Sequence, residues 1–316
     1  MGYRNIYIKH ALHMSYKHCS LIIEKEDDVI EIPLEDIATI LLEDHKTTIT
    51  SALISELAKN YIVLIMCDKR YLPCSMMIPI HTYYRELKVF NQQLDAKKTM
   101  ISQLWSFIVS SKIKNQMSVL EICKCDQKYI EMLKEICKEI KAGDKTNREA
   151  VAAKIFFHAM YGSTFIRNHN SGDAINMALN YGYSIMAAHM TRVLSLYGFH
   201  TMIGLHHDSK TNNFNLAYDF VEPFRSLVDL YVYKNKDEIF SPLSKEIRYD
   251  LINLTQETVI LEEKNYSVQN AMEEIVLSFK KCLEKQDSSF LVLPGIKINE
   301  KDRDNELQID ESSSSI

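Results

Sequence analysis

The segment from Leu104 to Ile122 reads LWSFIVSSKIKNQMSVLEI, and it decides the fold class of this chain. Its apolar residues, such as Leu104, Ile108 and Leu120, alternate with polar residues at helical spacing. The wider segment from about residue 84 to residue 141 contains neither proline nor glycine. Because these two residue types interrupt helices, their absence predicts long helices in this part of the chain.

The whole chain is poor in turn-forming residues, with 8 glycines and 6 prolines among 316 residues. This composition argues against an all-β fold. Hydrophobic residues make up 46% of the chain and charged residues 25%, which is typical of a soluble globular protein with a sizeable core. Further helices are expected at about residues 148–160, 174–197, 222–233, 244–254 and 267–283.

Residues 1 to about 80 show a different pattern, in which short β-branched runs are separated by polar turns. Strands are expected at residues 5–8, 19–24, 29–33 and 38–42. A helix is expected to begin after Thr50 or Ser51 and to end near Asn60. The continuous apolar run IVLIM at residues 62–66 predicts a strand that is buried on both faces.

The predicted fold class is therefore α+β, with a small β-rich N-terminal domain followed by a larger all-α C-terminal domain. We place the N-terminal domain at residues 1–80, a linker at 81–84 and the helical domain at 85–285. Residues 286–316 are expected to form an acidic, partly disordered tail. Residues 284–316 hold eight acidic side chains against four basic ones, and four serines precede the last residue.

The net charge of −5 taken alone argues against a nucleic-acid-binding protein. Most of that charge comes from the tail, however, and residues 68–114 carry eight basic side chains against three acidic ones. This basic stretch is either a phosphate-binding surface or a solvated helix face. The seven cysteines are scattered without a CxxC pair, and no apolar run is long enough to span a membrane. These features predict a cytoplasmic protein with reduced thiols and no membrane association.

Three short segments carry candidate ligands for a metal ion. Glu149 opens an alanine-rich helical run, where small side chains would let a ligand approach; the alternative is an exposed first-turn acid that complements the helix dipole. His206 and His207 are adjacent, so at most one imidazole is expected to enter a given site, and the alternative is a surface pair. Asp219 is expected to be a helix N-cap on the same helix face as Glu222, so that both carboxylates could face one site. The alternative is that Asp219 only caps the helix.

Together, these segments would supply two carboxylates from Glu149 and Glu222 and one imidazole from His206 or His207. Oxygen and nitrogen ligands of this kind suit Mg²⁺ or Mn²⁺. No cysteine lies near them in the sequence, which argues against a structural zinc site.

The same segments resemble the CRISPR-associated integrase family, the universal Cas endonuclease of spacer acquisition, in the versions that accompany type II loci. The resemblance covers roughly residues 1–285. It is carried by NREAVAAKIFF (147–157), ALNYGYSIM (178–186), GLHHDSKTNNFNLAYDFVEPFRSLVD (204–229) and IPLEDIATILLED (32–44).

The resemblance implies that Glu149, His207 and Glu222 hold a Mg²⁺ or Mn²⁺ ion in a catalytic C-terminal domain, with Asp219 as a second acid near the site. His207 is preferred to His206 because its distance from the EPFR segment matches the family pattern. The implied reaction is metal-dependent DNA cleavage and strand transfer, in which a 3′-hydroxyl attacks a phosphodiester at the edge of a repeat and a new spacer is inserted.

The resemblance also implies the partners of the protein. They are DNA, as prespacer and CRISPR repeat, a second copy of the chain bound through the N-terminal domain, a small dimeric CRISPR-associated protein, and proteins of a type II effector locus. Five basic residues near the motifs are candidates for contact with the DNA backbone: Arg148, Lys154, Arg167, Lys210 and Arg225. The alternatives are a non-catalytic DNA-binding scaffold of the same fold, or a metallohydrolase that acts on a small phosphorylated molecule.

Overall fold

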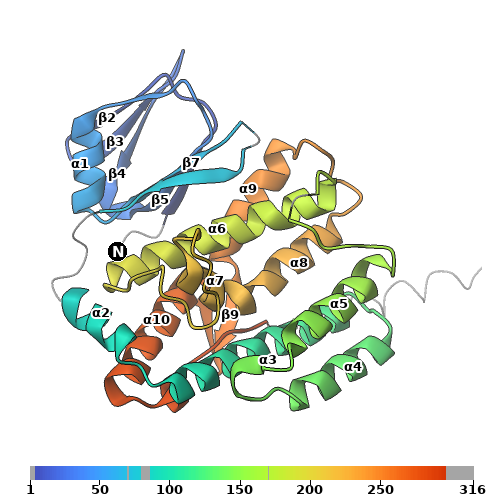
Figure 1. Ribbon diagram of the computed structural model, residues 1–316. Coiled ribbons are helices and arrows are strands. Elements are labelled where there is room, and N and C mark those ends of the chain that lie inside the picture. The colour runs from blue at the N-terminus through green and yellow to red at the C-terminus, as the bar shows by residue number, and fades with distance from the viewer. Residues whose placement is uncertain (1–3, 70, 80–85, 170, 297–316) are drawn as a thin grey trace, which may run out of the picture.

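The computed structural model describes residues 4–69, 71–79, 86–169 and 171–296. A β-rich N-terminal domain lies against a larger helical domain, as the α+β prediction requires (Figure 1). The predicted linker at residues 81–84 lies outside the described residues, as do residues 297–316 at the end of the predicted tail.

Two four-stranded sheets form the N-terminal domain. The first has the order β1-β5-β7-β8, with β1 and β7 parallel to the central β5 and with β8 antiparallel to β7. The second has the order β4-β3-β2-β6. The bounds are β1 Arg4–Ile8, β2 His13–Lys17, β3 Ser20–Glu24, β4 Val29–Pro33, β5 Ile37–Leu42, β6 Thr48–Ile49, β7 Val63–Cys67 and β8 Pro73–Met77.

The two central strands of the first sheet, β5 and β7, are buried on both faces, which explains their continuous apolar runs. Leu41 and Ile65 point into the core of the helical domain. Their neighbours Leu42 and Leu64 point into a separate core between the two sheets. Because side chains alternate between the faces of a strand, a strand between two cores has no polar face. The prediction of a doubly buried strand near residues 62–66 is confirmed.

The helix α1 (Ser51–Lys59) covers the N-terminal core and has the expected ends. The hydroxyl of Thr50 accepts a hydrogen bond from the backbone N–H of Leu53 at 3.2 Å, which makes Thr50 the N-cap. Asn60 ends the helix, and Leu53 and Leu57 are fully buried on its inner face.

The helical domain is built around two long helices, α3 and α6. The 25-residue α3 packs against α4, α5 and α8, and α6 is buried along most of its length between α7, α8 and α9 (Figure 1). The bounds are α2 Glu86–Leu94, α3 Lys98–Ile122, α4 Gln127–Lys138, α5 Arg148–Tyr161, α6 Ala174–Leu196, α7 Asn215–Val221, α8 Arg225–Lys234, α9 Lys245–Asn253 and α10 Val268–Lys285. The predicted long helices are confirmed.

The C-terminal domain differs from the prediction in carrying a small three-stranded sheet. Its order is β10-β9-β11, with bounds β9 Thr258–Leu261, β10 Lys264–Ser267 and β11 Gly295–Ile296. Residues 286–296, which we expected to begin the tail, instead pack on α3. The side-chain amide of Asn115 donates to the backbone oxygen of Pro294 at 3.0 Å, and the N–H of Ile296 donates back to Asn115 at 3.2 Å.

A buried ion pair joins the two domains. Glu43 follows β5 and is 2% exposed, and Arg248 on α9 is 4% exposed. The Nε and Nη2 atoms of Arg248 donate to the two carboxylate oxygens of Glu43 at 2.7 and 2.9 Å. Asn5 strengthens the same junction by donating to the hydroxyl of Thr255 at 2.8 Å. A two-pronged contact of this kind fixes both the distance and the direction between the domains.

Breaking this pair should destabilise the protein strongly. We expect Glu43→Gln to lower the free energy of unfolding by about 3–5 kcal/mol, because the Arg248 charge stays buried without its counter-ion. Denaturant unfolding measures the change. The matched control is Glu56→Gln, which breaks an i,i+3 pair with the largely exposed Lys59 and should cost less than about 1 kcal/mol. Equal effects of the two changes would contradict this role of the Glu43–Arg248 pair.

Candidate active site

The structure brings Glu149 and Glu222 together around a lysine that the sequence patterns assigned only to the basic stretch. The Nζ atom of Lys112 on α3 lies 2.5 Å from Glu149 Oε1 and 2.5 Å from Glu222 Oε2. The side chains of Lys112 and Glu222 are 8% and 2% exposed, whereas Glu149 is 22% exposed and lies toward the open side. Three segments that are distant in the sequence therefore meet at one buried charge cluster.

Glu149 is positioned by the way α5 begins. Asn147, just before the helix, adopts the left-handed conformation, with a φ of 51°. The buried carboxylate of Asp144 accepts hydrogen bonds from the backbone N–H groups of Arg148 and Glu149, each at 2.9 Å. Asp144 thus satisfies the free N–H groups of the first turn and fixes the direction in which Glu149 leaves the helix.

Glu222 is held by the short 3₁₀ turn from Glu222 to Phe224, which separates α7 from α8. Arg225, one turn further on, donates to Glu222 Oε1 at 2.9 Å, and its guanidinium lies 4.8 Å from the centre of the Tyr183 ring. The side-chain amide of Asn115 donates to the backbone oxygen of Pro223 at 2.8 Å. Asn115 therefore ties the Glu222 turn to α3, three residues beyond Lys112.

Asp219 is not the helix N-cap that we expected. It lies inside α7, is fully buried, and holds the loop that precedes the helix. Its carboxylate accepts hydrogen bonds from the backbone N–H groups of Leu205, His206 and His207 at 2.5, 3.3 and 3.2 Å. It also lies 2.7 Å from Nδ1 of the His207 ring.

The Asp219 contact sets the state of the His207 ring. The hydrogen bond to Asp219 is the main cause that raises the pKa of His207 above its usual value. When Nδ1–H donates to Asp219, the neutral ring presents the lone pair of Nε2 on its other side. A histidine that is held in this way by a carboxylate is well suited to bind a metal ion.

The two adjacent histidines differ in their surroundings. The His206 ring stacks on Trp105, with 4.3 Å between centroids and 2° between planes. The His207 ring meets the same indole edge-on, at 5.9 Å and 82°. Both rings thus contact Trp105, contrary to the expectation that neighbours on an extended chain point apart, because the loop here is curved around Asp219.

Each charged group in the cluster is stabilised by neighbours of opposite charge. Burial disfavours the charge on Lys112, but the carboxylates of Glu222 and Glu149 outweigh it and raise the pKa of Lys112. Burial likewise disfavours ionised Glu222, and the charges of Arg225 and Lys112 overcome it and lower the pKa of Glu222. The opposite charges around them therefore favour the charged forms of Lys112, Glu222 and Arg225.

The carboxylates of Glu149 and Glu222 and the imidazole of His207 are donors that suit a divalent cation. The structure does not gather these three side chains into one metal site. Among the described residues, no three His, Cys, Asp or Glu side chains are gathered closely enough to hold a metal ion. The ammonium group of Lys112 lies between the two carboxylates, where its positive charge offsets theirs as a metal ion would. Carboxylate oxygens and an imidazole are ligands that Mg²⁺ and Mn²⁺ accept.

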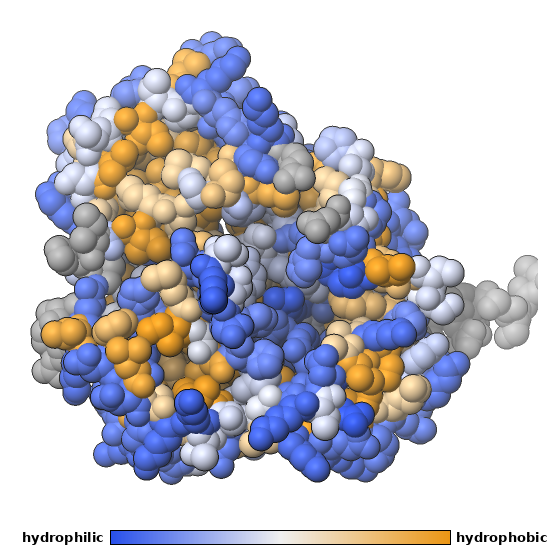
Figure 2. Space-filling model, viewed as in Figure 1, coloured by the Kyte–Doolittle hydropathy of each residue, from blue (hydrophilic) through white to orange (hydrophobic). Residues whose placement is uncertain are grey.

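A cavity of about 430 Å³ opens beside the charge cluster. Its lining includes His207 and Arg225, together with His169, Tyr183 and Tyr218. In the space-filling view, hydrophilic residues surround the hollow near the middle of the molecular face (Figure 2). Eight of its nine described lining residues carry a polar side-chain group, so the cavity can accept a charged ligand.

The five basic residues named as DNA contacts have different surroundings. Arg225 is part of the charge cluster, and Arg167 donates to the side chains of Asn176 and Asn180 at 2.8 and 2.6 Å. Arg148 lies 3.1 Å from Glu139. Lys154 and Lys210 are exposed. Within the basic stretch, Lys112 faces the carboxylates instead of solvent, and Arg70 and Arg85 lie outside the described residues.

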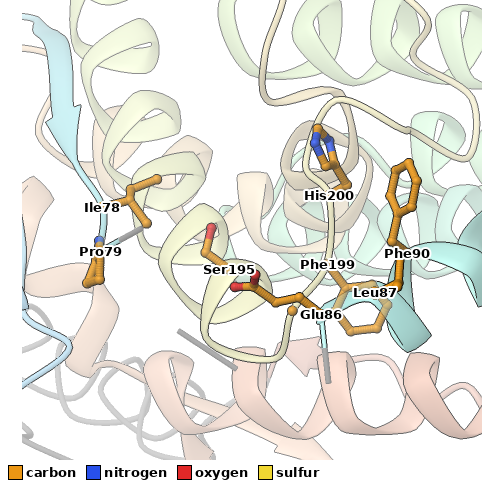
Figure 3. Close-up of a pocket in the computed structure, with 9 residues that line it drawn as sticks. Ile78, Pro79, Glu86, Leu87, Phe90, Ser195, Phe199 and His200 are labelled. Atoms are coloured by element: carbon orange, nitrogen blue, oxygen red, sulfur yellow. The ribbon is translucent and has the colours of Figure 1, made fainter. Parts of the chain in front are cut away.

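A second cavity of about 510 Å³ lies elsewhere, between the start of α2 and the end of α6. Phe90 and His200 lie side by side on its wall, with ring centroids 5.4 Å apart (Figure 3). Leu87 and Phe199 add apolar surface, and Glu86 is the acidic residue of its described lining. It lacks the paired carboxylates of the charge cluster, so we place the candidate active site at Lys112, Glu149 and Glu222.

Comparison with known proteins identifies the family to which this chain belongs. The family model described as CRISPR associated protein Cas1 matches residues 6–240. The CRISPR-associated endonuclease Cas1 of Neisseria meningitidis serogroup C (strain 8013) is 36% identical over 298 residues, which are 94% of this chain and 97% of the relative. The chain belongs to the Cas1 family. The resemblance inferred from the motifs is confirmed, and with it the assignment as a CRISPR-associated endonuclease and integrase.

Solved structures with the same fold extend the comparison. A casposase bound to integration product has a TM-score of 0.75 at 18% identity, over 98% of this chain and 99% of that one. A Cas1 protein from Thermotoga maritima has a TM-score of 0.73 at 15% identity, over 89% of this chain and 97% of that one. A chain of a Cas6-RT-Cas1–Cas2 complex has a TM-score of 0.73 at 21% identity, over 91% of this chain and 36% of that one. These likenesses confirm the fold.

The loop around Asp219 should tolerate no side chain at Gly204. A Cβ atom there would lie 2.2 Å from the backbone oxygen of His207 and 2.8 Å from Asp219 Oδ2. We expect Gly204→Ala to lower the free energy of unfolding by roughly 1–3 kcal/mol, measured by denaturant unfolding. Gly172→Ala is the control, because a Cβ atom added at Gly172 would meet nothing within 4 Å. A Gly204→Ala protein as stable as the control would contradict this account of the loop.

Asp229 on α8 should make stability depend on pH. It is buried, accepts a hydrogen bond from the Tyr183 hydroxyl, and burial raises its pKa to about 7. Between about pH 4 and 7 the folded protein keeps a proton that the unfolded chain releases, so stability falls as the pH rises through this window. Asp229→Asn removes this loss.

The stability of Asp229→Asn relative to the unchanged protein should therefore increase from about pH 5 to pH 8, by roughly 3 kcal/mol. Urea unfolding at the two pH values measures it. Asp237→Asn, at an exposed position after α8, serves as the control and should show no such trend. A difference for Asp229→Asn that does not vary with pH would show that Asp229 is ionised throughout.

Proposed function

We propose that this Cas1-family protein cleaves and joins DNA with a Mg²⁺ or Mn²⁺ ion held by Glu149, His207 and Glu222. The observation that supports the site most directly is the Lys112 bridge. Two carboxylates from different helices converge on one positive charge at 2.5 Å each. A position that holds a monovalent ammonium between two carboxylates has the charge and the oxygen donors that a divalent cation requires.

The bound cation would neutralise the non-bridging phosphate oxygens and activate the phosphodiester as a Lewis acid. The protein supplies the remaining parts. Asp219 orients the His207 ring, so that Nε2 is available as a ligand. Asn115 and Arg225 hold the turn that carries Glu222. Phosphoryl transfer depends mainly on such positioning and on charge neutralisation.

The substrate we propose is DNA, both the prespacer and the CRISPR repeat. The reaction is attack of a DNA 3′-hydroxyl on a phosphodiester at the edge of a repeat, which inserts a spacer. The open cavity beside His207 and the exposed Lys154 and Lys210 would receive the backbone of the DNA. We further propose a homodimer and a small dimeric CRISPR-associated partner, since a chain of a Cas6-RT-Cas1–Cas2 complex shares the fold.

A second candidate is a DNA-binding scaffold that does not use a metal ion. The Lys112 bridge also supports this alternative, because the ammonium already neutralises the two carboxylates. The cluster would then be a structural ion network in the core of the helical domain. The two functions predict different responses to metal ions, and the next experiment separates them.

Strand transfer into a repeat-containing plasmid should require Mn²⁺ or Mg²⁺ and should fall at least about 100-fold in Glu149→Gln, His207→Ala and Glu222→Gln. Each change removes one proposed ligand. His206→Ala is the matched control and should keep most of the activity, because that ring stacks on Trp105 and is not held by a carboxylate side chain. Full activity of the three variants, or DNA binding without any metal-dependent product, would favour the scaffold.

A further inference from the structure

Lys112 is the least expected member of the site, because it is a buried cation at the centre of proposed metal ligands. Its side chain is 8% exposed. Within the described part of the chain, its ammonium group contacts the carboxylates of Glu149 and Glu222 and no other charged group. Burying an ammonium group is costly unless anions surround it, so this lysine depends on both acids.

A metal ion and this ammonium group cannot use the same oxygens together. The Nζ atom lies 2.5 Å from one oxygen of each acid. A Mg²⁺ ion would need those oxygens at about 2.1 Å, and the two positive charges would repel each other in a buried site. Metal binding therefore requires Lys112 to leave, which its flexible four-carbon side chain permits.

Several carboxylate oxygens around the cluster that the structure describes already have partners, which leaves few of them to receive the displaced ammonium group. The other oxygen of Glu222 is paired with Arg225 at 2.9 Å. Both oxygens of Asp219 accept hydrogen bonds from residues 205–207. Asp229 already accepts a hydrogen bond from Tyr183. An anion supplied from outside is a better partner for the ammonium group, and the scissile phosphate of the proposed DNA substrate is such an anion.

The charge count points the same way. Glu149 and Glu222 are balanced by Lys112 and Arg225 in the structure. A divalent cation added to this set leaves an excess positive charge in a largely buried place, which is unfavourable. A phosphodiester at the open side, next to Glu149, would offset part of that excess. Metal and DNA should therefore assist each other's binding.

We propose that Lys112 is an exchangeable counter-ion. It holds Glu149 and Glu222 together before the metal binds, yields their carboxylates to the metal, and then pairs with a non-bridging phosphate oxygen of the DNA. The inference rests on the metal site proposed above. Its consequence is that DNA raises the affinity for the metal through Lys112, which limits metal binding when no DNA is present.

The test is to measure Mn²⁺ binding by electron paramagnetic resonance, with and without a short DNA duplex at fixed salt concentration. In the unchanged protein, DNA should tighten Mn²⁺ binding roughly 10-fold or more. In Lys112→Met, Mn²⁺ should bind more tightly without DNA, and the further gain from DNA should largely disappear. The control is Lys114→Met, which removes an exposed charge from the same helix and should keep the full gain.

Tighter binding without DNA could follow from the loss of any nearby positive charge, so the gain from DNA is the decisive quantity. Lys112→Gln is the second variant, because its amide can still hydrogen-bond to the acids if the Met side chain prevents folding. Thermal melting gives an independent readout. Without metal, both Lys112 variants should melt at a lower temperature than the unchanged protein, and Mn²⁺ should raise their melting temperature more.

The outcomes separate the two proposals. If the gain from DNA is the same in the Lys112 variants as in the unchanged protein, the exchange is overturned, while Mn²⁺ binding that is lost in Glu149→Gln would still support the metal site. If the unchanged protein binds no Mn²⁺, or Glu149→Gln binds it equally well, the metal site itself is wrong and the exchange fails with it.

Discussion

The ion pairs between Lys112 and the acids Glu149 and Glu222 are the contact on which the arrangement of the helical domain depends. They join α3, the first turn of α5 and the 3₁₀ turn before α8, three elements that other helices separate along the chain. Burying an ammonium group without anions is costly, so a packing of these elements that moved either acid away from Lys112 would be penalised. The placement of Glu149 and Glu222 around Lys112 therefore matters both for helix packing and for the proposed chemistry of the site.

The surrounding structure supports this cluster from several directions. Asp144 fixes the beginning of α5, and Asn115 fastens the Glu222 turn to α3. The same Asn115 binds the backbone next to β11, so the chain near residue 295 is anchored one helical turn from Lys112. The junction between Glu43 and Arg248 then sets the helical domain against the sheets. Each contact is buried or partly buried, and each uses a polar group that would be costly to leave unpaired.

Sequence patterns predicted the elements that depend on local physics and missed those that depend on pairing. Long helices without proline or glycine, the Thr50 cap and the doubly buried β7 could be predicted, because spacing and capping act over a few residues. Strand β2, with the sequence HMSYK, and the two-residue strands β6 and β11 could not. β2 and β11 contain few β-branched residues and β6 is only two residues long, so each is recognised as a strand only by its pairing with a neighbouring strand.

The sequence by itself determined the family, the two-domain α+β plan and the identity of the candidate ligands, since motif letters and hydrophobic periodicity are properties of the chain. Tertiary structure alone decided how these residues act. It turned Asp219 from an expected cap into the buried partner of His207, and Lys112 from a surface base into the counter-ion of the site. The role of a charged side chain depends on the charges close to it in space. Lys112 is 37 and 110 residues from its partners Glu149 and Glu222 along the chain, so only folding brings them into contact.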